Sequence, residues 1–95
     1  MTGTEKQIKL AKDIITNARE TIRCNIEKAT EIGRIADVEI WNEISRQMEM
    51  AIVKCMDQEN SAAVIIRNRN VLSGENLCFT FYRVYMSKNR QEQPD

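Results

Sequence analysis

The chain has 95 residues, which predicts one small domain, and its 14 basic and 14 acidic side chains give a formal net charge of zero. That balance excludes a strongly acidic DNA mimic and a strongly basic general DNA binder, and it ranks nucleic acid last among the partners that we expect. Only five residues are aromatic, so a composition led by Ile, Ala, Val and Met favours helices packed on helices.

A capping-box pattern opens the first expected helix, because Thr4 is followed three residues later by Gln7. Behind it, apolar residues recur at spacings of three and four, which places them on one face of a helix. These residues are Ile8, Ala11, Ile15, Ala18, Ile22, Ile26, Ala29 and Ile32. We expect one long helix over residues 4–32 that ends near Gly33, with small alanines that allow close approach of a partner helix.

A second helix is expected over residues 38–57, with Asp37 as its N-cap. Its apolar positions again recur every three or four residues, and the short link to the first helix favours an antiparallel hairpin. Trp41, the only tryptophan, lies near its start and is either a core anchor or an interface hot spot.

The pattern weakens after residue 60. Residues 62–69 fit a short helix capped by Asn60 or Ser61, but Val64, Ile65 and Ile66 also fit a strand. Residues 73–76, Ser-Gly-Glu-Asn, predict a turn. Residues 77–86 are rich in aromatic and β-favouring side chains that alternate, so we interpret them as a strand. This strand would pair with residues 65–72 in a hairpin or with another subunit.

The expected fold class is therefore α+β and mainly α: an antiparallel pair of long helices, a short helix or strand, and a C-terminal β-strand or hairpin. An all-α fold, with residues 77–86 in a third long helix, is the alternative. Residues 1–90 form the expected domain and residues 91–95 a flexible tail. The thin aromatic core and the long Ile/Ala stripe favour a homo-oligomer, at least a dimer.

Catalytic and metal chemistry are not indicated. The chain has no histidine, the usual general base, and no Gly-rich phosphate loop. Glu39 and Glu43 lie one helical turn apart, but we expect them on a solvated face. The three cysteines form no Cys-x-x-Cys pair, so no zinc site is expected. We expect no enzyme, no catalytic residue, no metal and no cofactor.

The scattered thiols of Cys24, Cys55 and Cys78 are interpreted as reduced, buried cysteines of a cytosolic protein. The N-terminal residues lack the apolar region of a signal peptide, and the longest apolar run, residues 62–66, is far too short to span a membrane. A cytoplasmic protein without membrane contact is the expectation.

Basic residues gather in the C-terminal third, where residues 61–90 hold five bases against Glu75 alone. Arginine side chains suit phosphate, and tyrosine rings offer faces on which a base can stack. The candidate ligand- or partner-binding residues are Arg67, Arg69, Tyr82, Arg83, Tyr85 and Trp41. The simpler interpretation is a solubilising rim that guards a β-edge.

Two short motifs of the chain resemble motifs of a known class of proteins. They are TEKQIKLAKDI near the start and SAAVIIRNR about 50 residues later. The chain resembles small uncharacterised proteins of bacteriophages and mobile elements, which begin with a T-x-x-Q-x-x-x-A helix and later carry a short apolar helix ending in Arg. The resemblance implies a short helix at residues 61–69 and a mobile-element origin. Residues 64–66 depart from that pattern, since they are aliphatic where aromatic residues are expected.

Three functions follow, in decreasing order of support. The first is a non-enzymatic phage-type binding protein that inhibits a host protein or defence system through protein–protein contact in the host cytoplasm. The second is an oligomeric sponge that sequesters an anionic small molecule such as a nucleotide signal, with Arg67, Arg69, Arg83 and a tyrosine arranged between subunits. The third is a weak nucleic-acid binder, whose affinity would fall steeply with salt.

Overall fold

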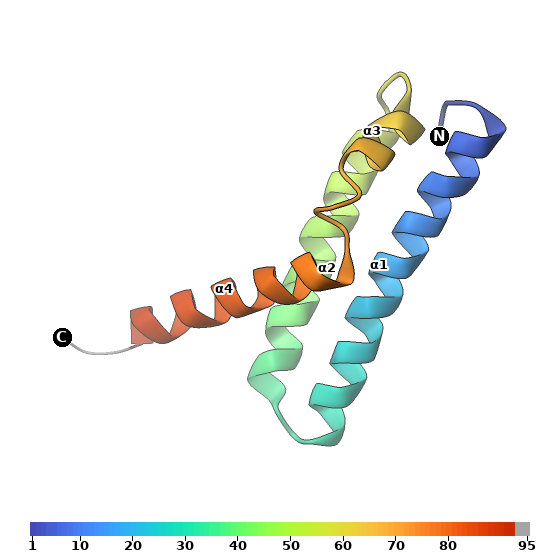
Figure 1. Ribbon diagram of the computed structural model, residues 1–95. Coiled ribbons are helices and arrows are strands. Elements are labelled where there is room, and N and C mark those ends of the chain that lie inside the picture. The colour runs from blue at the N-terminus through green and yellow to red at the C-terminus, as the bar shows by residue number, and fades with distance from the viewer. Residues whose placement is uncertain (93–95) are drawn as a thin grey trace.

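Four helices make up the part of the chain that the computed structural model describes, which is the backbone of residues 1–92 and the side chains of residues 1–88. They are α1 (Glu5–Glu31), α2 (Ile35–Met56), α3 (Ser61–Arg67) and α4 (Gly74–Glu92) (Figure 1). No strand occurs within these residues, so the expected α+β fold is wrong and the all-α alternative is correct.

The start of α1 is the expected capping box. The Thr4 hydroxyl accepts a hydrogen bond from the backbone N–H of Gln7 at 3.2 Å, and the Gln7 side-chain oxygen accepts from the N–H of Thr4 at 3.0 Å. Each side chain thereby satisfies a backbone N–H that the first helical turn would otherwise leave without a partner.

The end of α1 is a Schellman turn centred on Gly33. The N–H of Arg34 donates to the carbonyl of Ala29 at 2.8 Å, and the N–H of Gly33 donates to that of Thr30 at 3.2 Å. Gly33 has a φ of 75°, a left-handed conformation that glycine adopts without steric cost. This turn reverses the chain within three residues, so α2 returns antiparallel to α1 as expected (Figure 1).

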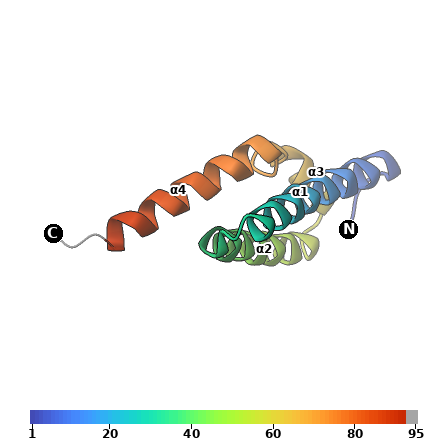
Figure 2. The same cartoon turned by 90° about the horizontal axis from the view of Figure 1, so that it is seen from below.

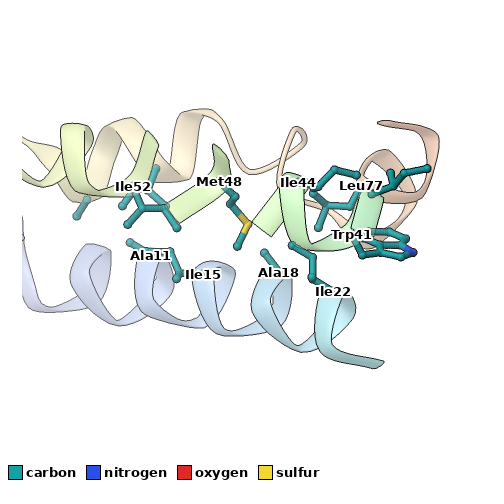
Figure 3. Close-up of a cluster of buried hydrophobic side chains, with 12 residues drawn as sticks. Ala11, Ile15, Ala18, Ile22, Trp41, Ile44, Met48, Ile52 and Leu77 are labelled. Atoms are coloured by element: carbon teal, nitrogen blue, oxygen red, sulfur yellow. The ribbon is translucent and has the colours of Figure 1, made fainter. Parts of the chain in front are cut away.

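The core lies mainly between α1 and α2. Figure 3 shows Ala11, Ile15, Ala18 and Ile22 of α1 directed toward Ile44, Met48 and Ile52 of α2, and all seven side chains are buried. Alternation of small and branched side chains on α1 lets the two helix backbones approach closely. The predicted stripe is thus the packing face of α1 except for Ile32, which follows the helix and is 69% exposed.

The start of α2 differs from the expectation. Arg34, not Asp37, occupies the N-cap position, and its side chain makes no cap hydrogen bond. Asp37 lies inside the first turn and pairs with Arg34 at 2.8 Å. Because the Schellman turn ends at Arg34, α2 begins directly after it, and an acidic side chain in the first turn still favours the helix dipole.

Helix α3 is short, as one of the two interpretations of this segment required, and Asn60, one of the two predicted caps, occupies its N-cap position. Asn60 makes no side-chain cap bond, and Ser61 is the first helical residue. The cap comes from Thr2, whose carbonyl accepts from the N–H of Ala62 at 3.0 Å and whose hydroxyl accepts from the N–H of Ser61 at 3.2 Å. The Ser61 hydroxyl accepts in return from the N–H of Thr2 at 2.8 Å.

Residues 77–86 are helical in α4, so the predicted strand and hairpin are wrong, and the predicted turn at residues 73–76 is the start of this helix. The Ser73 hydroxyl accepts from the N–H of Asn76 at 3.3 Å and satisfies an amide of the first turn. The side chains of residues 77–86 alternate in character with a period of two residues, as in a strand. However, Leu77, Phe81 and Val84 are also spaced by four and three residues, as on one face of a helix. Packing of that face against α1 and α2 decides between the two periods.

From its contact with the hairpin, α4 extends away from the other helices (Figures 1 and 2). The expected flexible tail, residues 91–95, falls partly on its last residues, because α4 runs to Glu92 and residues 93–95 lie outside the described residues.

One ion pair joins α1 to α2 at the surface. Two nitrogens of the Arg19 guanidinium donate to the two carboxylate oxygens of Glu49 at 2.6 and 2.8 Å. The hydrogen bond with Arg19 lowers the pKa of Glu49, against a smaller desolvation effect that raises it. Both side chains are substantially exposed to solvent, which screens the pair, so we expect it to stabilise the fold by about 0.2–1 kcal/mol.

This contribution should depend on pH. A carboxyl group whose pKa is lower in the folded state stabilises above the unfolded pKa, about 4.3, and loses that effect as the pH falls through the folded value. We expect Glu49→Gln to reduce the free energy of unfolding at neutral pH and to have a smaller effect near pH 3, as measured by urea denaturation. Glu59→Gln, at an exposed position with no ion pair among the described residues, is the control. A Glu49→Gln effect of equal size at both pH values would contradict the assignment.

Candidate protein-binding groove

An apolar groove of about 600 Å³ opens between α2, α3, the loop that follows α3, and α4. Helices α3 and α4 do not pack against each other, although both contact the hairpin, so the space between them stays open. The apolar side chains that line it are Ile44, Met48, Ala51, Ile52, Val64, Ile65, Val71, Leu72, Leu77 and Val84.

Polar groups at the groove are few, and several are already bonded within the chain. The Glu43 carboxylate accepts hydrogen bonds from Arg46 and Gln47, and these bonds, with Arg46 the larger cause, lower the pKa of Glu43 to about 2. The Asn68 side-chain N–H donates to the carbonyl of Val64 at 2.8 Å. Glu43 therefore stays ionised at neutral pH and is not available as a general acid.

Metal-binding clusters are not found within the described residues, where no three His, Cys, Asp or Glu side chains converge. Glu39 and Glu43, the acidic pair noted in the sequence, are not joined in one site, because Glu43 forms an ion pair with Arg46. Both Glu39 and Glu43 are exposed on α2, on the solvated face that the sequence predicted.

Trp41 and Tyr85, two of the predicted site residues, belong to one aromatic row. The Trp41 ring stacks on Phe81 with centroids 4.9 Å apart, and Phe81 stacks on Tyr85 at 6.3 Å. Trp41 is only 4% exposed, so it is a core anchor that holds α4 on the hairpin rather than an open contact residue. Tyr85 is half-buried at the outer end of the row.

The other four predicted site residues are exposed and are divided among α3, the loop that follows it, and α4. Arg67 ends α3, Arg69 lies in the loop after it, and Tyr82 and Arg83 lie on α4. None of the four lines the apolar groove. Tyr82 and Arg83 are thus neighbours on α4, whereas Arg67 and Arg69 belong to a segment whose helix, α3, does not pack against α4.

Sequence reasoning missed the groove, because its walls come from three separate segments. The sequence pattern does not distinguish Val64, Leu72 and Val84 from ordinary core residues, but in the fold they border an open space. The one available signal was Val71-Leu72, an apolar pair directly before the predicted turn, where a loop exposed to water is usually polar.

The cysteines also differ from the prediction. Cys24 and Cys55 are half-buried, and Cys78 is exposed at a smaller hollow of about 220 Å³ near Trp41 and Phe81. The prediction of three buried thiols is therefore wrong. All three are free, and the Cys55 thiol lies 3.7 Å from the carbonyl oxygen of Ser61, to which it donates.

Comparison of this chain with models of protein families, with curated proteins and with solved structures finds no match. Among the described residues, none of the helices combines the length and apolar character needed to cross a bilayer. The groove and the exposed faces of the helices are therefore the observations on which a function can be argued.

Proposed function

We propose that this chain is a non-enzymatic binding protein whose groove between α2, α3 and α4 takes an amphipathic helix from a partner protein. The groove itself is the observation that carries the proposal, because ten apolar side chains border an open space on a small domain. A helix laid in such a groove would bury its apolar face through anchors spaced three or four residues apart.

The chemistry of the walls favours a helix over a small polar ligand. Small-molecule sites usually place several polar groups to fix the orientation of the ligand. Here Glu43 and Asn68 are engaged within the chain, while Lys54 and Gln58 stand at the border. An apolar helix face needs few hydrogen bonds, since its backbone groups are already paired within the helix.

Stoichiometric inhibition is the mode of action that we propose for such binding. A chain that covers a partner's helix would block the contacts which that helix makes elsewhere, with no chemical step. The absence of histidine from the sequence and the arginine-paired state of Glu43 support a role without catalysis. Three free cysteines suit a reducing compartment, so we place this activity in the cytoplasm.

Ala51 offers the sharpest test, because it is exposed and lines the groove. We expect Ala51→Arg to fill the groove with a charged side chain and to weaken partner binding at least about tenfold without unfolding the protein. A photo-crosslinking residue at Gln47, on the same border, would first identify the partner in the cells that make the protein. Calorimetry with the purified partner then compares the variants.

Ala36→Arg is the matched control, since Ala36 is also exposed on α2 but does not line the groove. It should bind like the unchanged protein. Equal binding by Ala51→Arg would overturn the proposal, and so would release of a small apolar molecule from the purified protein as the groove's occupant.

A further inference from the structure

The outer face of α4 is apolar and uncovered in a single chain. Phe79, Tyr82 and Met86 are 66%, 62% and 41% exposed, and their spacing of three and four places them on one side of the helix. Leu77, Phe81 and Val84 lie on the opposite side, toward the hairpin. Apolar side chains thus occupy more than half of the helix circumference, a pattern typical of a helix that is packed on two sides.

The surface of the whole chain is also larger than that of a compact monomer. A folded monomer of 11.0 kDa is expected to expose about 5,600 Å², whereas this chain exposes 7074 Å². Its radius of gyration is 15.3 Å, against about 12 Å for a compact domain of this length. The excess surface, roughly 1,450 Å² for each chain, is larger than the 800 Å² that each partner contributes to a standard stable interface.

We propose that two copies of this chain pair through the outer faces of their α4 helices, antiparallel and related by a twofold axis. In that arrangement each α4 is covered on one side by its own hairpin and on the other by the second copy. Figure 2 shows that α4 extends away from the other helices, which leaves space beside it for a second copy.

The outer apolar face of α4 is complementary to the same face of a second copy that runs in the opposite direction. Tyr82 lies between Phe79 and Met86 along α4, so antiparallel pairing sets Phe79 of each copy beside Met86 of the other and brings the two Tyr82 rings near the axis. Spacings of three and four are those of a helix–helix seam. The formal net charge of zero adds no overall repulsion between two copies.

Sedimentation of the purified full chain over a range of concentrations tests this pairing. We expect a dimer for the unchanged protein and a dissociation constant at least about tenfold higher for Tyr82→Glu, because a carboxylate would be buried at the axis. Val53→Glu is the matched control: Val53 is 63% exposed on α2 and should tolerate the same charge with the dimer intact. Circular dichroism confirms that both variants stay helical.

A disulfide trap reports the geometry separately. With the three natural cysteines replaced, Tyr82→Cys should form a disulfide-linked dimer on oxidation, because Cα atoms of bridged cysteines lie within about 7 Å. Val53→Cys in the same background should not form this disulfide.

A protein that is monomeric at about 100 µM overturns the proposal. So does a dimer that Tyr82→Glu leaves unchanged, or one that Ala51→Arg dissociates instead. The inference stands apart from the groove, since Ala51→Arg tests partner binding and Tyr82→Glu tests self-association.

Discussion

Replacing Trp41 with alanine should cost about 3–5 kcal/mol of unfolding free energy, the largest loss that we expect from any single substitution in this chain. The indole is buried, and it is the inner end of the aromatic row that continues through Phe81 to Tyr85. Deleting it removes the apolar area that the ring buries and leaves a cavity beneath α4. Folded domains have only about 5–15 kcal/mol of net stability, so this loss brings the protein close to unfolding.

The same substitution should free α4 before it unfolds the hairpin. Helix α4 is held by Leu77 and the aromatic row, whereas α1 and α2 also meet through the isoleucines, alanines and Met48 of the same core. Most of the stability of a helix in a protein comes from packing of its apolar face, so α4 without its anchor should lose helicity. Amide hydrogen exchange would report this as faster exchange in α4 than in α1.

Trp41→Phe is the matched variant, because a smaller ring can still stack on Phe81. It should lose less stability than Trp41→Ala and keep α4 protected from exchange. If α4 stays equally protected in Trp41→Ala, then the aromatic row is not what holds it, and the assignment of Trp41 as the anchor of α4 is wrong.

The elements that the sequence predicted well are those specified by neighbours along the chain. The capping box at Thr4, the Ile/Ala stripe and the break at Gly33 all act within one or two helical turns, and the structure contains each of them. Asp37 was misassigned because the position of a cap depends on where the preceding turn ends, and that turn ends at Arg34.

The elements that the sequence predicted poorly depend on distant contacts. Residues 77–86 satisfy two periodicities at once, and the contact between Phe81 and Trp41, forty residues apart, is what selects the helix. The cap of α3 comes from Thr2, which no local pattern near Ser61 could reveal. The groove is a space between segments, so it has no sequence pattern of its own.

Basic residues illustrate the same limit. Five bases in the last third of the sequence indicated a surface for an anion, but charge along a chain does not fix where side chains meet. Arg67 and Arg83 are on helices that do not pack together, and Arg83 is exposed on α4, beside the apolar residue Tyr82. A nucleotide site would need arginines from two copies of the chain. The proposed pairing through Tyr82 would have to bring those arginines together.

Enlarging two of the three alanines in the α1 stripe, Ala11 and Ala18, should have the second large effect. Ala11 and Ala18 are 0% and 1% exposed, and they face Ile52 and the Ile44–Met48 side of α2 (Figure 3). Leucine at either position would force the two helices apart or push side chains into strained rotamers, at a cost of about 1–3 kcal/mol. Because the two positions are about 10 Å apart along the helix, their costs should add to roughly 2–6 kcal/mol.

Urea denaturation followed by circular dichroism measures this cost, with Ala36→Leu as the control at an exposed alanine of α2. The control should change stability by less than about 0.5 kcal/mol, as surface substitutions usually do. Leucine is a strong helix former, so a loss of stability in Ala11→Leu and Ala18→Leu would come from packing and not from helix propensity. A double variant as stable as the unchanged protein would mean that α1 does not meet α2 through its alanines, and that the hairpin packs on another face.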